Sequence, residues 1–363
     1  MTDRDGPADA ADPLTAAPAD PPGLADPPGL ADPPAPADPP EAAIARPGAS
    51  LFTIEGRAAP GLFVVGWLAT ILGLGLVVIG AFAASGFLLF FLGPTILTIG
   101  LVAGAGNQAI ERRVRGFAYA GPSPYLVLAA IVAAVYAIGS AIGLGLHLAF
   151  GSSDVPRYLV NLLGVAIQGA VFLAILRLIV VGTDALTWSD MGWRRFDGRA
   201  VRDTLFGFSL AIPVIVLTAA IAAGLVAVFK VVPESPLPPT GVTEGLIVQL
   251  IAGALIAPIA EEAVFRGFAI SAWRRTVGES GALVRASLVF ALAHVVNVSG
   301  ATFGEAGGLI VVGFATRIPV ALALGWLFLR TRSIWAPIGL HVAFNGILLI
   351  GAELATMNGV APG

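Results

Sequence analysis

The chain has 363 residues, of which 57% are hydrophobic and only 12% are charged, whereas an ordinary soluble domain carries about 25% charged residues. Its net charge of −3 is the sum of two unlike regions. Residues 1–50 hold nine acidic and two basic side chains, whereas the rest of the chain holds fourteen acidic and eighteen basic ones. This composition excludes a soluble protein, and we expect no nucleic-acid partner. The absence of cysteine excludes disulfides and thiol chemistry.

The first 55 residues are expected to form a disordered tail rich in proline, alanine and aspartate. A six-residue repeat, Pro-Pro-Gly-Leu-Ala-Asp, occupies 21–26 and 27–32, and a variant of it follows at 33–38. Proline at this density cannot build helices or sheet ladders and favours extended chain. We interpret the tail as a solvated acidic tether.

Hydrophobic runs follow the tail, and most of them approach the twenty or so residues that a transmembrane helix needs. They predict an all-α fold, a polytopic bundle of about eight or nine transmembrane helices, with one run uncertain. The run at 284–298 is short, and the run at 86–106 contains Pro94. The nine runs are 61–83, 86–106, 124–150, 158–182, 203–229, 245–272, 284–298, 308–329 and 334–354.

Arginines cluster in the connections that follow the second, fourth, sixth and eighth runs. With nine spans, all these connections lie on one side, which the positive-inside rule makes cytoplasmic. We therefore expect a multi-pass cell-membrane protein with a cytoplasmic N-terminus. Its alanine-rich composition and its preference for arginine over lysine are typical of bacteria and indicate a bacterial inner membrane. We divide the membrane part into N-terminal helices at 56–185 and a C-terminal core at 186–357, which contains the polar motifs described next.

Three polar motifs lie inside the last hydrophobic runs, where ionisable groups are costly and indicate function. At about 1.5 Å per residue, each lies roughly 12 to 18 Å from the nearest arginine-rich connection or its edge. Because these depths are similar, we expect the motifs to form one site. The motifs are Glu261-Glu262-Ala-Val-Phe-Arg266, Phe290-Ala-Leu-Ala-His294 and His341-Val-Ala-Phe-Asn345.

The first motif contains a predicted ion pair and a second carboxylate. Glu262 and Arg266 are spaced i,i+4 with the acid first, which is the favoured order for a helical pair. Glu261 lies about 100° around the helix, so it is free to act as a general base. The alternative is a purely structural buried salt bridge with a spare carboxylate.

The other two motifs supply imidazoles and an amide. Phe290 precedes His294 by one turn and can fix the orientation of its ring. His341 and Asn345 are also one turn apart, and paired donors in a dry site suit a developing oxyanion. Helix-to-helix polar contacts are the alternative for both motifs. His147 has no polar companions and is interpreted as structural.

These motifs resemble those of the CAAX proteases and bacteriocin-processing enzymes (CPBP), a family of intramembrane proteases that includes type II CAAX prenyl endopeptidases. The family pattern is Glu-Glu-x-x-x-Arg, Phe-x-x-x-His and His-x-x-x-Asn, and the resemblance covers roughly 190–354. It implies an intramembrane endopeptidase that hydrolyses peptide bonds of membrane-associated substrates. In the implied mechanism, Glu261 and His294 activate water, while His341 and Asn345 stabilise the oxyanion. Glu262, Arg266 and Phe290 would support the site.

The family is commonly labelled as metalloproteases, and Glu261, His294 and His341 can be drawn as a zinc site with an open position. We favour activation of water without a cofactor, because Asn345 is a poor zinc ligand and suits an oxyanion hole. The expected partners are membrane lipid and a peptide or protein substrate that is lipidated or embedded in the membrane. The motifs specify neither the substrate nor the cleavage sequence.

Two other classes of function compete with a protease. One is a non-catalytic membrane scaffold, for example a bacteriocin-immunity factor, which needs no complete set of catalytic motifs. The other is a transporter that uses buried Glu and His as a proton relay. The sequence has no evident inverted repeat of the kind many transporters contain. We therefore prefer the protease.

Overall fold

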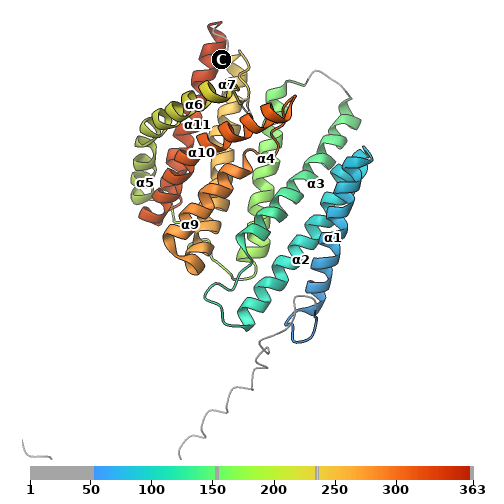
Figure 1. Cartoon of the computed structure of the whole chain (residues 1–363). Helices are drawn as coiled ribbons and strands as arrows, with labels where there is room; N and C mark the ends of the chain where they lie inside the picture. The colour runs from blue at the N-terminus through green and yellow to red at the C-terminus, as the bar shows by residue number, and fades with distance from the viewer. Residues whose placement is uncertain (1–52, 152–154, 234, 236, 360–363) are drawn as a thin grey trace, which may run out of the picture. The chain divides into compact units, whose positions relative to one another are not determined.

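The computed structural model describes residues 53–151, 155–233, 235 and 237–359. Every regular element in this part of the chain is an α-helix or a π-helix (labelled η), so the predicted all-α fold is confirmed for it (Figure 1). The predicted tail at 1–55 lies outside the described residues, apart from its last three. The elements are α1 (Pro60–Phe82), η1 (Leu88–Leu92), α2 (Gly93–Val114), α3 (Pro124–Phe150), α4 (Arg157–Leu176), η2 (Arg177–Val181), α5 (Gly198–Ser209), α6 (Ala211–Phe229), α7 (Thr243–Gln249), η3 (Leu250–Ile256), α8 (Ala257–Glu262), η4 (Ala263–Ile270), α9 (Ser271–Ala293), α10 (Phe303–Thr331) and α11 (Trp335–Met357).

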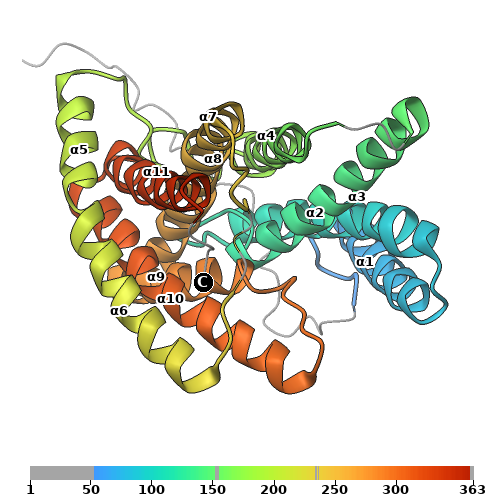
Figure 2. The same ribbon diagram turned by 90° about the horizontal axis from the view of Figure 1, so that it is seen from above.

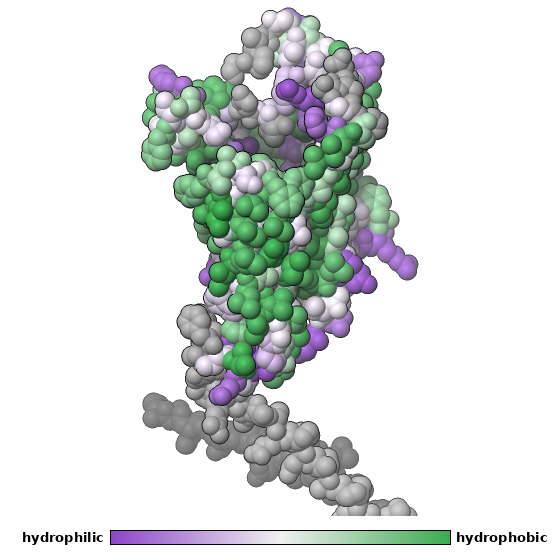
Figure 3. Space-filling model, turned by 90° about the vertical axis from the view of Figure 1, so that its right-hand side faces the viewer, coloured by the Kyte–Doolittle hydropathy of each residue, from purple (hydrophilic) through white to green (hydrophobic). Residues whose placement is uncertain are grey.

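Eight continuous helical runs in the described residues are long and apolar enough to cross a membrane. This number agrees with the predicted eight or nine spans. Side chains such as Leu68 and Ile71 of α1 are 65% and 59% exposed, which suits contact with lipid. Figure 3 shows a broad hydrophobic band across one face, with hydrophilic residues gathered toward its ends. The protein is therefore a multi-pass membrane protein.

The sixth of these runs, Thr243–Ala293, contains the sixth and most of the seventh predicted spans. It is 51 residues long, which at about 1.5 Å per residue is more than twice the thickness of a bilayer core. Gly278 breaks it with a φ of 76° and a ψ of 178°, a conformation that glycine adopts without a Cβ penalty. The part of this run that follows Gly278 ends at Ala293, so the predicted helix at 284–298 is too long at its C-terminal end.

The predicted run at 203–229 also differs, because it comprises two helices. α5 and α6 meet at Leu210, and α5 begins upstream of the prediction because Asp197 caps it. The carboxylate of Asp197 accepts a hydrogen bond from the N–H of Ala200 at 2.9 Å, which satisfies a free donor of the first turn. The N-cap thus extends the helix toward the preceding polar connection.

The four arginine-rich connections contact one another or their neighbours at one end of the bundle. The Asp190 carboxylate belongs to this network, because hydrogen bonds from Thr187 and the charge of Arg275 hold its pKa below the ordinary value. The predicted shared side of these connections is therefore confirmed, while the cytoplasmic assignment of that side stays a prediction. The contacts are Arg332 with Glu279, Arg275 with Asp190, Trp335 with the carbonyl of Arg194, and Arg113 with the carbonyl of Thr183.

The helices that carry the three motifs pack together in the C-terminal half. Seen from above, α11 lies between α5 on one side and α7 and α8 on the other, while α1 to α3 lie beyond α4 (Figure 2). α9 contacts both α10 and η4. One hydrophobic core includes Val127 of α3, Ile175 of α4 and Phe268 of η4. This core crosses the predicted boundary between 56–185 and 186–357, which stays a prediction.

Close backbone contact between α5 and α11 fixes the position of the helix that carries His341. A Cβ atom at Gly339 of α11 would overlap the carbonyl oxygen of Thr204, and a Cβ atom at Gly207 of α5 would overlap that of Ala336. The partner atoms belong to the backbone, so they cannot swing aside as a flexible side chain would. Glycine is therefore required at both positions of this helix contact.

We expect Gly339→Ala to destabilise the protein by about 1–3 kcal/mol, because the added methyl group forces α5 and α11 apart. Thermal unfolding in detergent micelles measures this loss. Gly351→Ala in the same helix is the matched control, since nothing lies within 4 Å of a Cβ atom there. Equal melting temperatures for the two variants would contradict the predicted backbone clash.

Candidate active site

A buried ion pair connects the first motif to the rest of the bundle. Arg266 Nη1 donates to Glu262 Oε1 at 3.0 Å, and the two side chains are 1% and 0% exposed. Arg266 Nη2 donates to the carbonyl of Ala321 at 3.4 Å, and the guanidinium lies 4.2 Å from the centroid of the Phe290 ring. The predicted i,i+4 pair is therefore present, and it connects η4 to α9 and α10.

His341 approaches the same carboxylate from α11. Its Nδ1 lies 2.7 Å from Glu262 Oε1, and the imidazole is 5% exposed. An ionised carboxylate only accepts hydrogen bonds, so Nδ1 of His341 carries the proton. In the neutral imidazole, Nε2 then presents a lone pair on the opposite side of the ring.

His294 is oriented in the same way by a backbone carbonyl. It is the residue directly after the end of α9, and its Nδ1 lies 2.7 Å from the carbonyl oxygen of Phe290. The Phe290 ring is 4.4 Å from the imidazole, centroid to centroid. The prediction that Phe290 contacts and orients His294 is confirmed, and the carbonyl contributes as well as the ring. Nε2 of neutral His294 is again an acceptor.

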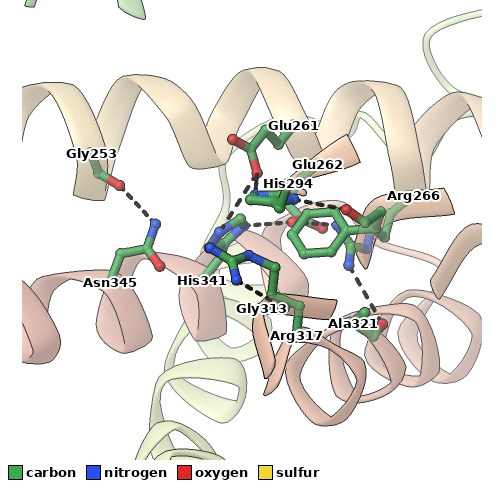
Figure 4. Close-up of polar contacts among 11 residues, drawn as sticks. Gly253, Glu261, Glu262, Arg266, His294, Gly313, Arg317, Ala321, His341 and Asn345 are labelled. Atoms are coloured by element: carbon green, nitrogen blue, oxygen red, sulfur yellow. Dashed lines mark hydrogen bonds and ion pairs between the residues drawn. The ribbon is translucent and has the colours of Figure 1, made fainter. Parts of the chain in front are cut away.

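Glu261 faces both imidazoles (Figure 4). Its Oε2 lies 3.8 Å from Nε2 of His294 and 3.9 Å from Nε2 of His341. These separations exceed the usual 2.7–3.2 Å of a direct hydrogen bond. The Oε2 atom is buried and has no hydrogen-bond partner among the described residues. Glu261, His294 and His341 therefore converge on one point, as the similar depths of the three motifs predicted.

Asn345 lies one turn beyond His341, and its amide is directed at the sixth run. Nδ2 of Asn345 donates to the carbonyl oxygen of Gly253 at 2.8 Å. In this π-helical stretch the N–H of Ala257 donates to the carbonyl of Ala252, five residues earlier. In the same register the carbonyl of Gly253 would accept from residue 258, but that residue is proline and has no N–H. The Gly253 carbonyl accepts a hydrogen bond from the amide of Asn345 instead. One N–H of Asn345 is thus engaged away from Glu261.

Arg177 and Arg317 also lie inside the predicted spans, but neither belongs to the three motifs. Arg177 is exposed, whereas the charge of Arg317 interacts with Glu261 and His294. Arg317 is therefore a site residue that the motifs missed. Its position deep inside an apolar run was the available signal.

The two imidazoles and the Glu261 carboxylate have the donor chemistry of a zinc site, and each Nδ1 is bonded to an oxygen as in many metal centres. Within the described residues, however, no group of three or more His, Cys, Asp or Glu side chains is placed to hold a metal ion. As arranged, this set does not fit a metal ion. The zinc set of Glu261, His294 and His341 stays a prediction.

Comparison with known proteins agrees with the motifs. Residues 243–347 match the family model described as "Type II CAAX prenyl endopeptidase Rce1-like". No curated protein and no solved structure matches the chain. The matched segment is narrower than the predicted 190–354, but it contains every predicted site residue and Arg317. The chain is thus a multi-pass membrane protein in which residues 243–347 are similar to an Rce1-like type II CAAX prenyl endopeptidase domain.

We expect Arg266→Met to destabilise the protein by about 3–5 kcal/mol, because it leaves the Glu262 carboxylate buried without its cation. Arg275→Gln is the matched control, since Arg275 pairs with Asp190 where both side chains are about a third exposed, and such pairs contribute about 0–1 kcal/mol. Unfolding of both variants in the same detergent measures the difference. Similar losses for both would show that the buried pair is not a special constraint.

Proposed function

We propose that this protein is an intramembrane endopeptidase that hydrolyses peptide bonds of membrane-associated substrates with a water molecule activated by Glu261 and His294. The observation that carries the proposal is the convergence of Glu261 Oε2 with two imidazole Nε2 atoms inside a segment matched as Rce1-like. The apolar helices around this segment favour a lipid environment and a peptide that reaches the site from the membrane.

The hydrogen bonds of the site support a water molecule as the reacting group. Glu261 Oε2 and the Nε2 atom of neutral His294 both accept hydrogen bonds, so the group between them must donate. Water has two O–H donors and can bridge these two acceptors, which lie 3.8 Å apart. Glu261 then takes one proton from this water as general base. His294, held at Nδ1 by the carbonyl of Phe290, orients the water.

The remaining steps use His341 and Asn345. When the water oxygen attacks the peptide carbonyl carbon, negative charge develops on the carbonyl oxygen. We assign His341 and Asn345 to stabilise this oxyanion, through a protonated Nε2 and the second N–H of the amide. The C–N bond then breaks, and Glu261 gives its proton to the leaving amine.

We expect Glu261→Gln to abolish proteolysis, because an amide cannot take a proton from water. The measurement is a mass-spectrometric survey of new protein termini in native membranes of cells that carry the wild type or the variant. Termini that vanish in Glu261→Gln identify the substrates together with the activity. Glu244→Gln is the control, since Glu244 is an exposed carboxylate at the start of the same helical run.

The same survey separates the protease from its alternatives. Identical termini in wild-type and Glu261→Gln cells, together with a phenotype of the deletion strain, would favour the membrane scaffold or immunity factor. Proton-coupled flux through purified protein in liposomes, lost in Glu261→Gln, would favour a transporter. Either result would overturn the proposed peptide hydrolysis.

We expect activity to survive treatment with a strong chelator, because the proposed mechanism uses only protein side chains and water. Activity on a substrate from the survey is measured before and after dialysis, and the metal content of the protein is determined in parallel. Stoichiometric zinc, whose removal abolishes activity and whose return restores it, would replace this mechanism with the zinc set of Glu261, His294 and His341.

A further inference from the structure

Arg317 lies at the middle of α10, where burying a charge within the membrane is costly. It is about 21 Å from either end of the helix at 1.5 Å per residue, which is too far for its side chain to reach either membrane surface. Its Nη1 instead donates to the carbonyl oxygen of Gly313 at 2.7 Å. A burial cost of this kind marks an intramembrane arginine as functional unless it is paired.

The backbone of α10 brings this arginine to the end of α9. A Cβ atom at Gly313 would lie 3.0 Å from Cγ1 of Val295, the residue after His294, and 3.5 Å from Nη1 of Arg317. The absence of a side chain at Gly313 therefore lets α10 approach the segment that carries His294. Figure 4 shows Arg317 extending from α10 toward the two imidazoles and Glu261.

Arg317 differs from Arg266 in having no carboxylate partner. Among the described residues, its nitrogens form no ion pair within 4.0 Å, yet its charge interacts with Glu261 and His294. A guanidinium has several N–H donors, of which only one is engaged by Gly313. Its other donors are free to bind a group that lies between Arg317 and Glu261.

A count of charges supports a direct role. Glu261 and Glu262 carry two negative charges, and Arg266 and Arg317 carry two positive ones. The described cluster is therefore neutral while both imidazoles are neutral. Glu262 is already paired with Arg266, so Arg317 is the cation that balances Glu261. When Glu261 takes a proton from water, this balancing charge becomes available to the product of the attack.

The donors assigned from the motifs are incomplete without this cation. Asn345 has one N–H committed to Gly253, and His341 donates from Nε2 only when it carries a second proton. A permanent cation beside the base meets the need of a developing oxyanion directly. Arginine keeps its proton at any pH of interest, so it requires no prior protonation step.

We propose that Arg317 is a further catalytic residue, which donates hydrogen bonds to the oxyanion formed when water attacks the substrate carbonyl. The water oxygen forms a bond to the carbonyl carbon, the C=O electron pair moves to oxygen, and the proton moves to Glu261. As the C–N bond breaks, the pair returns from oxygen and the amine takes the proton. This inference rests on the proposed peptide hydrolysis and deepens it.

A second role for a cation is to hold the free carboxylate of a substrate that is cut close to its C-terminus. A carboxylate three residues beyond the cut lies about 10 Å away in an extended peptide. Figure 4 shows the Arg317 side chain extending toward His341 and Glu261, so the first role is the one that its direction favours. The two roles differ in kinetics, because carboxylate binding affects KM and oxyanion binding affects kcat.

The experiment measures kcat and KM of the full chain in lipid nanodiscs on a quenched peptide that spans a Glu261-dependent cleavage site. We expect Arg317→Gln to lower kcat by about 10²–10³-fold, as for loss of one oxyanion donor, with little change in KM. Arg317→Lys should recover part of the loss. Thr316→Val is the control, since Thr316 is the neighbouring residue and bonds back to Val312 in the same way.

Two results would overturn the role of Arg317. One is an unchanged kcat in Arg317→Gln, and the other is a rise in KM alone that disappears when the peptide carboxylate is amidated. Melting curves of all variants in the same nanodiscs separate loss of folding from loss of chemistry. If Arg317→Gln does not fold, the kcat of Arg317→Lys provides the test. If Glu261-dependent cleavage is absent altogether, the proposed hydrolysis fails, which is a distinct result.

Discussion

The carboxylate of Glu262 is the constraint on which the site depends. A single oxygen, Oε1, accepts hydrogen bonds from Arg266 at 3.0 Å and from His341 at 2.7 Å, so it joins η4 to α11. Buried charges cost several kcal/mol each unless they are paired and hydrogen-bonded. Removing either donor would leave that cost uncompensated. The sharing of one oxygen therefore fixes both the tautomer of His341 and the separation of the two helices around it.

Irregular helix geometry places the other groups around this centre. Glu261 and Glu262 end a short α-helical stretch between the π-helical segments η3 and η4, and π-helical turns occur often at functional sites. The turns change which carbonyls are satisfied within the helix, and Gly253 then accepts the amide of Asn345. His294 stands just past the end of α9, so a helix terminus, and not a helix face, presents it. Backbone departures from the α-helix thus help to position Glu261, His294 and Asn345.

Much of the fold and of the site was predictable from the sequence, because lipid imposes simple rules. Apolar runs predict helices, and the i,i+4 spacing of Glu262 and Arg266 predicts their ion pair. The break at Gly278 agrees with the sequence, because it lies in the polar connection between the predicted runs at 245–272 and 284–298. The contact of Asn345 with Gly253 depends on a π-helical register that leaves no sequence pattern. Arg317 was missed because its neighbours Glu261 and His294 belong to other helices, and no local spacing connects them.

The two arginines explain how one membrane site can be both stable and reactive. Arg266 donates to Glu262 and to a backbone carbonyl, packs against an aromatic ring and is only 1% exposed, so it contributes rigidity. Arg317 is anchored by one carbonyl and keeps its other donors. In a site of low dielectric, an unpaired donor gains most when a new negative charge forms beside it. In the proposed mechanism, structural support and chemistry are therefore divided between the two arginines, because each carboxylate has its own cation and only Glu262 is paired with one in direct contact.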